Sequence, residues 1–202
     1  MPKLKKGKFI LGVTGNIACG KSTVAGIFKR KDCLLIDADC LGHKTLSVGT
    51  GTHKKIIKSF GPGILRSDHS IDRARLSEIV FTDRYALAKL NRIVHPELVR
   101  LIKHNIGSSK KRIIILDAAL IVEAGLAGMV DKLVVVTAKK QQQISRGQKS
   151  LKLSRKQIMQ RIKSQISQKA KSHFADFIID NSGQLSKTKQ QVYKIRRQLW
   201  KS

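Results

Sequence analysis

The sequence predicts an α/β protein built on a parallel five-stranded sheet that is flanked by helices. Short aliphatic runs, each continuous in Ile, Leu or Val, recur along the chain, as expected for strands that are buried on both faces. Helical patterns separate these runs, and such alternation is typical of a parallel sheet. A glycine-rich segment, "GVTGNIACGKST" at residues 12–23, follows the first run.

The elements follow from these patterns in chain order. Strands are predicted at residues 8–14, 33–37, 112–117, 132–137 and 176–180, and a first helix at residues 21–29. Two regions interrupt the alternation. Residues 40–105 are mostly helical, with apolar helical spacing at 74–81 and 84–102 and a turn signal, "FGPG", at 60–63. Residues 139–170 predict two basic helices joined near Ser150 and Leu151, and the polar run 181–190 predicts a loop before a C-terminal helix.

Length and composition restrict the class of protein. The 202 residues, 41% of them hydrophobic, suit one folded domain. Three widely spaced cysteines, Cys19, Cys33 and Cys40, form no disulfide framework and predict reduced thiols. The N-terminal "MPKLKKGKFI" lacks the apolar core of a secretory signal, and no segment approaches the ~18 apolar residues of a membrane span. We therefore expect a cytoplasmic protein with no membrane partner.

The net charge of +28 is extreme. Residues 139–202 hold 17 Lys and Arg against two Asp, a net of +15. Such a field attracts nucleic acid, anionic lipid or phosphorylated small molecules, although lysines that simply cover solvated faces give the same composition. An aromatic content of 4% argues against a base-stacking surface, so no specific nucleic-acid partner is expected.

The glycine-rich segment fits the phosphate-binding pattern G-x-x-x-x-G-K-[ST] from Gly15 to Ser22. Glycines let the chain curl so that backbone N–H groups point at phosphate oxygens, and the following helix directs its positive end at the same anion. Lys21 then reaches the β- and γ-phosphates, and the Ser22 hydroxyl ligates Mg²⁺. The alternative is a glycine-rich turn without a ligand.

Carboxylates follow the second predicted strand. "LLIDADC" places Asp37 and Asp39 at its carboxyl end, which opens on the same edge of the sheet as the phosphate loop. Residues i and i+2 project to the same side of an extended chain. One carboxylate near the γ-phosphate can accept a proton from an acceptor hydroxyl, although either one can instead cap the next helix.

With these residues in place, the chain resembles a dephospho-CoA kinase. The family's motifs occur in order from about residue 8 almost to the end of the chain. The matching segments are "GKST" (20–23), "IDAD" (36–39), "FGPGIL" (60–65), "SIDRARL" (70–76), "IVHPEL" (93–98), "ALIVEAGL" (119–126), "KQQQISR" (140–146), "RIKSQ" (161–165) and "ADFIIDN" (175–181). Each later motif is weak alone, and their shared order is the strong signal.

The resemblance implies a P-loop kinase fold and the transfer of the γ-phosphate of ATP to the ribose 3′-hydroxyl of dephospho-CoA, the last step of CoA synthesis. It implies one domain, residues 8–202, with a core at 8–39, 106–138 and 171–202. A CoA-binding helical insert would occupy about 40–105 and a lid about 139–170. Asp39 would be the general base, with Lys21 and Arg146 as further catalytic residues and Ser22 as the metal ligand.

The implied partners are ATP with Mg²⁺ and dephospho-CoA, with the protein a monomer or weak oligomer. The implied ATP-binding residues are Gly15, Ala18, Cys19, Gly20, Lys21, Ser22, Thr23 and Arg146. The implied substrate-binding residues are Asp39, His95, Glu123 and Arg161.

The chain also departs from the family pattern. The family usually has Gly where Asn16 and Ala18 stand, and Asn tolerates left-handed backbone better than most residues. Ala119 replaces a proline, and Ser150 stands where a second lid arginine is often found. Lys149 is adjacent to it but offers a point charge in place of a bidentate fork.

Several roles stay open at this stage. Asp117 ends a strand and is either Mg²⁺-associated or a cap, and His95 is either structural or a substrate contact. Oxidation of Cys19 inside the loop would block nucleotide binding. The same parts also serve a kinase for another nucleotide or nucleoside, or, less simply, a nucleic-acid-binding protein that holds ATP only as a ligand.

Overall fold

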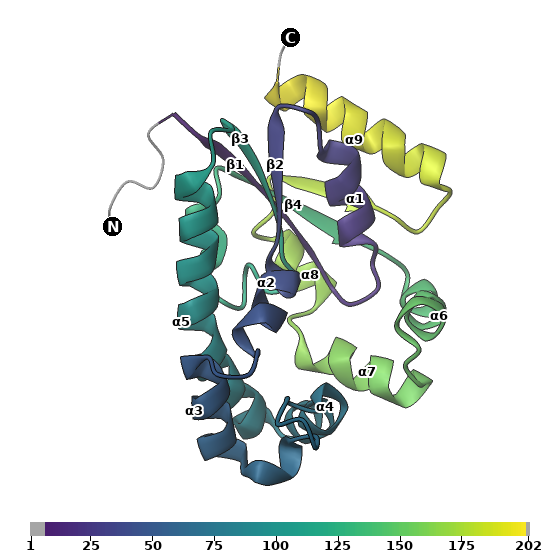
Figure 1. Cartoon of the computed structure of the whole chain (residues 1–202). Coiled ribbons are helices and arrows are strands. Elements are labelled where there is room, and N and C mark those ends of the chain that lie inside the picture. The colour runs from purple at the N-terminus through teal and green to yellow at the C-terminus, as the bar shows by residue number, and fades with distance from the viewer. Residues whose placement is uncertain (1–6, 201–202) are drawn as a thin grey trace. The chain divides into compact units, whose positions relative to one another are not determined.

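The sheet has five strands, all parallel, in the order β2-β3-β1-β4-β5 (Figure 1). The computed structural model of the chain describes residues 7–200, so the basic segment at residues 1–6 lies outside the description. The strands are β1 (Phe9–Gly15), β2 (Cys33–Asp37), β3 (Ile113–Asp117), β4 (Lys132–Thr137) and β5 (Phe177–Asp180). The fold class and all five strands predicted from the sequence are confirmed to within one or two residues.

The strand register brings polar side chains together at one edge of the sheet. β1 lies between β3 and β4, with Val13 opposite Asp117, and Asp37 of β2 lies opposite the same Asp117. The glycine-rich loop leaves β1 at this carboxyl edge. In open parallel sheets, ligands bind at the carboxyl ends of strands where the strand order reverses, which here is at β1.

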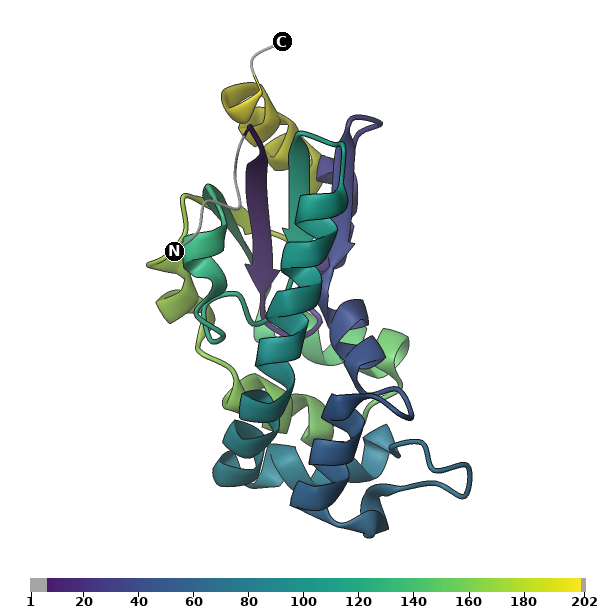
Figure 2. The same ribbon diagram turned by 60° about the vertical axis from the view of Figure 1, so that its left-hand side comes forward.

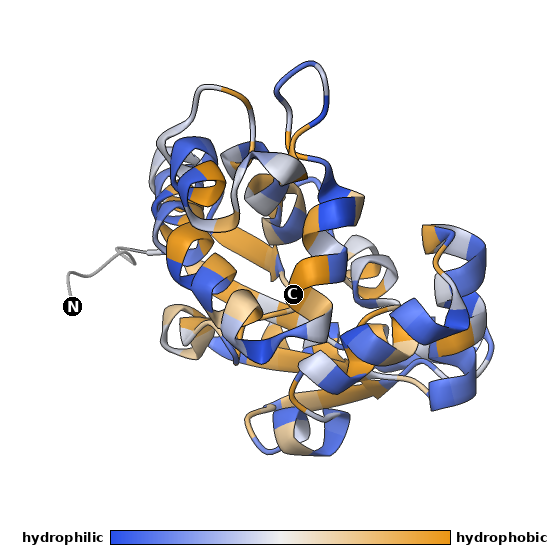
Figure 3. Ribbon diagram, turned by 90° about the horizontal axis from the view of Figure 1, so that it is seen from below, coloured by the Kyte–Doolittle hydropathy of each residue, from blue (hydrophilic) through white to orange (hydrophobic). Residues whose placement is uncertain are grey.

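Helices α1 (Lys21–Phe28) and α9 (Leu185–Leu199) pack together on one face of the sheet (Figure 1). The rings of Phe9 and Phe28 both meet Trp200 edge-on, at centroid distances of 6.3 and 6.1 Å. The strands are strongly hydrophobic, whereas the helices carry hydrophilic residues on their outer sides (Figure 3). This apolar layer fixes α1, and hence the loop that precedes it.

The expectation of a loop over residues 181–190 is wrong, because α9 begins at Leu185. The sequence of its first two turns is mostly polar. Thr188, Val192 and Ile195 are nevertheless buried, and their spacing places them on the same side of the helix. The Thr188 hydroxyl donates to Asn181 Oδ1 at 2.8 Å, so a buried polar contact at this position takes the place of an apolar one.

The basic region contains α6 (Lys140–Leu151) and α7 (Arg155–Ser164), followed by α8 (Gln168–Ser172). The predicted junction near Ser150 and Leu151 lies instead at 152–154. Lys152 ends α6 in the left-handed region (φ 53°), and Ser154 begins α7 with a reciprocal capping box to Gln157. A capping box is a strong signal for the start of a helix, so the box at Ser154 marks where α7 begins.

The remaining elements form a separate compact unit, residues 38–107, which we describe by itself. It contains α2 (Ala38–Thr45), α3 (Gly51–Phe60), a 3₁₀ turn (Pro62–Ile64), α4 (Arg73–Thr82) and α5 (Arg84–Ser108), whose last residue belongs to the sheet unit. An apolar cluster of its own holds it together: Ile56, Ile64, Ile71, Leu76 and Val80. The expected insert, about 40–105, nearly coincides with this unit, whose helices are also visible in Figure 2.

Within residues 7–200, none of the helices combines the length and the apolar character that crossing a bilayer would require.

Candidate active site

The loop between β1 and α1 is held by two close approaches of the backbone. A Cβ at Gly15 would lie 2.5 Å from the carbonyl oxygen of Val136, so only glycine fits against β4. Gly20 has φ 90°, in the left-handed region, and a Cβ there would collide with the Asn181 side chain. Asn181 Nδ2 donates to the Cys19 carbonyl at 2.8 Å, which fixes the loop from the side of β5.

Ala18 and Asn16 stand at the two loop positions where glycine was expected, and the structure accommodates each of them in a different way. Ala18 adopts φ 56°, a conformation that costs a non-glycine residue about 1 kcal/mol. Asn16 does not adopt positive φ, so the explanation through left-handed tolerance is wrong for this residue. Its side chain is 2% exposed and Nδ2 donates to the Ile166 carbonyl at 3.1 Å, so Asn16 links the loop to the segment after α7.

Lys21 lies where a phosphate-binding cation is expected. Its Nζ is 3.1 Å from Asp117 Oδ1 and 3.5 Å from Ser22 Oγ. The Asp117 side chain is almost wholly buried. Asp117 therefore holds the Lys21 ammonium at the carboxyl edge of the sheet, a contact that neither sequence interpretation of this carboxylate included.

A magnesium ion fits the residues at this edge. Ser22 is exposed in the first turn of α1, and Asp117 and Asp37 end adjacent strands. No cluster of three or more His, Cys, Asp or Glu suited to a metal occurs among residues 7–200. Mg²⁺ beside a phosphate loop takes much of its coordination from phosphate oxygens and water, so it does not require such a cluster.

The predicted Arg146 lies beside the loop. Its Nη2 donates to the Asn181 carbonyl at 2.9 Å, and its Nη1 is buried with no hydrogen-bond partner among the described residues. Nη1 lies 3.9 Å from the point where a Gly20 Cβ would stand. A hollow of ≈ 210 Å³ opens here, lined by Gly20, Thr23, Arg146, Asn181, Gly183 and Leu185. Thr23 and Arg146 thus both lie beside the loop.

The sequence did not predict the contacts that the segment after α7 makes with the phosphate loop. Gln165 Oε1 accepts a hydrogen bond from the backbone N–H of Ile17 at 2.9 Å, next to the bond between Asn16 and Ile166. Gln165 belongs to the segment "RIKSQ", whose resemblance to the family was the available signal. Arg161 of the same segment lies in α7 and is partly buried.

Glu123 participates in a buried network. Its Oε1 is 2.9 Å from Nζ of Lys171, a lysine that is wholly buried, and it also accepts from the Ile166 N–H at 3.3 Å. Lys171 Nζ donates to the Ala119 carbonyl at 2.7 Å, and the Thr14 hydroxyl donates to the same carbonyl at 3.1 Å. Glu123 Oε2 is buried with no hydrogen-bond partner among residues 7–200. Lys171 could not be distinguished in the sequence from the many lysines around it.

Asp39 and His95 lie in the other unit. Asp39 is exposed in the first turn of α2, which begins at Ala38 directly after β2. The expectation that Asp37 and Asp39 project alike from an extended chain is wrong, because the chain is already helical at Asp39. An acidic residue in a first turn also stabilises the helix through its dipole. His95 is half-buried in α5, and burial lowers its pKa.

We predict that Lys171→Met strongly destabilises the fold, because it leaves the Glu123 carboxylate buried without its cation. Breaking a buried pair typically costs ~3–5 kcal/mol. Urea unfolding measures the effect, and Lys169→Met, the same change at an exposed neighbour, is the control. Adding Glu123→Gln to Lys171→Met should restore part of the loss. Equal unfolding midpoints for the two lysine variants would contradict the network.

We predict that Cys19 is a poor target for oxidation or alkylation in the folded protein. The thiol is wholly buried, and burial raises its pKa to about 11, although a backbone hydrogen bond from Lys21 acts in the opposite direction. At pH 8 on the order of one such thiol in a thousand is ionised. Timed alkylation at pH 8 with mass spectrometry should show the exposed Cys40 modified first. Comparable rates at Cys19 and Cys40 would restore the hypothesis of an oxidation-sensitive loop.

Comparison with known proteins agrees with this geometry. The sequence model of dephospho-CoA kinase matches residues 9–187. A dephospho-CoA kinase of Carboxydothermus hydrogenoformans is 39% identical over 195 residues, covering 95% of this chain and 94% of the relative. Among solved structures, a dephospho-CoA kinase from Campylobacter jejuni has a TM-score of 0.66 at 30% identity, covering 95% of this chain and 97% of that one. TT1252 from Thermus thermophilus has a TM-score of 0.77 at 26% identity, covering 93% and 95%. The chain therefore belongs to the dephospho-CoA kinase family.

Proposed function

We propose that this protein transfers the γ-phosphoryl group of ATP to the ribose 3′-hydroxyl of dephospho-CoA, giving CoA and ADP in the last step of CoA synthesis. The observation that carries the proposal is the convergence of Lys21, Ser22 and the Arg146 side chain on one phosphate loop, in a member of this kinase family. ATP and dephospho-CoA are the proposed partners of a cytoplasmic monomer or weak oligomer, with no specific nucleic acid.

The loop and its neighbours supply the binding of ATP. Backbone N–H groups at the start of α1 and the positive end of that helix face the phosphates. Lys21 exchanges its Asp117 contact for oxygens of the β- and γ-phosphates. The buried Nη1 of Arg146 supplies a further donor beside Gly20. The hollow that Thr23, Gly183 and Leu185 share with Arg146 is the proposed place of the nucleoside.

The metal and the acceptor complete the proposed reaction. The Ser22 hydroxyl would hold Mg²⁺, with the Asp117 carboxylate near it, and the ion would neutralise charge on the phosphate oxygens. Asp39 is the proposed general base: its carboxylate accepts the proton of the acceptor hydroxyl as that oxygen bonds to the γ-phosphorus, and ADP leaves. Helices α6 and α7 form the proposed lid, which excludes water that would otherwise compete as acceptor.

Three further residues are proposed to contact dephospho-CoA. Glu123 offers its unpartnered Oε2 as a hydrogen-bond acceptor. His95, whose pKa is lowered by burial, is neutral at pH 7 and offers one ring donor and one ring acceptor. Arg161 supplies a cation for the substrate's phosphate groups.

An acceptor screen tests the function. With ATP and Mg²⁺, we expect ADP release to depend on dephospho-CoA, and mass spectrometry to find CoA as the second product. AMP, CMP and adenosine at equal concentration should give little release. Comparable turnover of a simple nucleotide would reassign the protein to another acceptor. Binding of RNA without phosphorylation of any of these acceptors would favour a nucleic-acid-binding role.

We predict that Asp39→Asn lowers kcat by ~10²–10⁴-fold, the usual contribution of a general base, and leaves ATP affinity nearly unchanged. Steady-state kinetics with dephospho-CoA and equilibrium nucleotide binding measure the two quantities. Asp37→Asn removes the same charge two residues away, also at an exposed position, and should reduce kcat much less. The reverse ranking would assign the base to Asp37, and near-normal turnover of both variants would remove both carboxylates from this role.

A further inference from the structure

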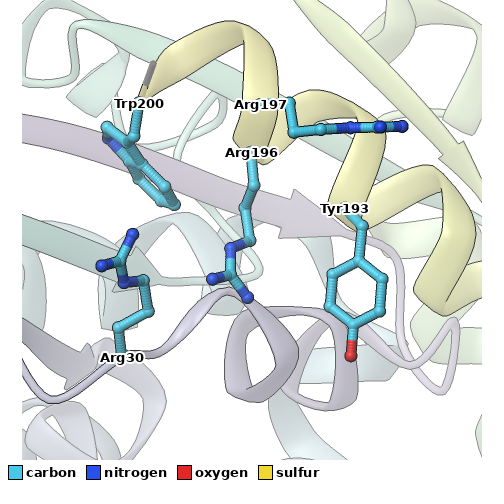
Figure 4. A pocket seen from close by; sticks show the side chains of 5 residues that line it. All are labelled: Arg30, Tyr193, Arg196, Arg197 and Trp200. Atoms are coloured by element: carbon cyan, nitrogen blue, oxygen red, sulfur yellow. The ribbon is translucent and has the colours of Figure 1, made fainter. Parts of the chain in front are cut away.

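A second hollow lies at the far end of α1 from the phosphate loop (Figure 4). It has a volume of ≈ 190 Å³ and is lined by Arg30, Tyr193, Arg196, Arg197 and Trp200. Arg30 follows α1, Tyr193, Arg196 and Arg197 lie in α9, and Trp200 directly follows α9. This hollow shares no lining residue with the one beside the loop, and the eight residues of α1 separate them by about 12 Å of helix.

Positive charge is concentrated around this hollow. Three of its five lining side chains are guanidinium groups, and α9 contributes five Lys and Arg and no acidic residue. Arg30 is paired with Asp32, whose Oδ1 lies 3.2 Å from Nε of Arg30 in an exposed pair. Because such exposed pairs contribute little energy, Arg30 can exchange this partner for another anion.

Helix electrostatics explain only part of this arrangement. Arg196 and Arg197 lie in the last turn of α9, where cations interact favourably with the helix dipole. Arg30 follows the C-terminal end of α1, whose own dipole also favours a cation, but neither dipole requires the two helix ends to bring their cations to one hollow. Arg30 shares the hollow with the Arg196 guanidinium, and two neighbouring guanidinium groups on a chain of net charge +28 favour the entry of an anion between them.

The side chains around the hollow also fit one ligand chemistry. Guanidinium forks match the geometry of phosphate oxygens, and Arg196 is held over the Tyr193 ring, with its Cζ 5.6 Å from the ring centroid. The Trp200 indole N–H is buried and has no acceptor among residues 7–200. The volume equals about six water molecules at ≈ 30 Å³ each, which is ample for a phosphoryl group with part of a sugar or ordered water.

We propose that this hollow is a second anion site, which binds a phosphoryl group of inorganic phosphate, pyrophosphate or a nucleotide. The site is separate from the catalytic phosphate loop and does not depend on the identity of the acceptor. Arg30 and Arg196, whose guanidinium groups both point into the space between them in Figure 4, contact the phosphoryl oxygens, whereas the Arg197 guanidinium points away and adds only to the local positive charge.

Trp200 makes the site directly observable, because it is the only tryptophan in the chain. In the full-length protein carrying Lys21→Ala, which disables the phosphate loop, we expect pyrophosphate to cause a saturable change in tryptophan emission. Phosphate and AMP are titrated in parallel, since their relative affinities distinguish a free anion from a nucleotide. Sodium chloride at matched ionic strength gives the non-specific response.

Substitutions test whether the change in tryptophan emission comes from this hollow. Arg30→Gln with Arg196→Gln should weaken pyrophosphate binding by at least about tenfold, the loss expected from removing charge-assisted hydrogen bonds. Lys29→Gln with Lys189→Gln removes the same charge at exposed positions outside the hollow and should change affinity little. Circular dichroism confirms folding, and Arg30→Gln alone is the fallback if the double variant does not fold.

Three results would overturn the proposal. One is equal weakening in the arginine and lysine pairs, which would show only a diffuse basic surface. The second is an emission change no larger than that of sodium chloride. The third is a response to an RNA oligonucleotide but to none of the small phosphates, which would make the hollow part of a nucleic-acid surface. Turnover of dephospho-CoA, measured on the protein with Lys21 intact, tests the proposed catalytic function separately.

Discussion

The close fit of the loop backbone between strands is the constraint on which the site depends. Gly15 passes against the Val136 carbonyl, and Gly20 passes against the Asn181 side chain, so neither position has room for a Cβ. Because β4 lies inside the parallel sheet and β5 is paired with it at the edge, the loop cannot relax outward without disturbing β4 or the end of β5. The positions of Lys21 and Ser22 follow, since they begin the helix that this loop must enter.

The chain has few carboxylates, and several of them pair with cations or accept hydrogen bonds from backbone N–H groups near the ends of strands. Only 13 acidic residues face 41 basic ones. Asp117 holds Lys21, and Glu123 holds the buried Lys171. Asp131 accepts from the Ile10 N–H at 2.7 Å, and Asp176 accepts from the Leu133 N–H at 2.8 Å. The excess positive charge is thus left on the outer faces of helices, where it is free to attract phosphorylated ligands.

The sequence predicted what local patterns determine. The five strands were predictable because each is a continuous aliphatic run, although only β1, β3 and β4 are almost wholly buried and the edge strands β2 and β5 are partly exposed. The phosphate loop was predictable because its geometry demands glycines at fixed spacing. The start of α9 was missed, since Thr188 is a polar residue buried by a hydrogen bond. Lys171 and Gln165 were not assigned to the site, because their partners lie 48 and 148 residues away along the chain, at Glu123 and Ile17.

The region of residues 139–170 is fastened to the phosphate loop at both ends. At one end Arg146 donates to the Asn181 carbonyl, while the Asn181 side chain donates to the Cys19 carbonyl. At the other end Gln165 accepts from the Ile17 N–H. A movement of α6 and α7 that left the loop unchanged would therefore have to break one of these attachments. A phosphate that accepts a hydrogen bond from Arg146 would also act on the Asn181 contacts that fix the shape of the loop. We therefore expect nucleotide binding and the position of these helices to be coupled through the backbone of residues 15–20.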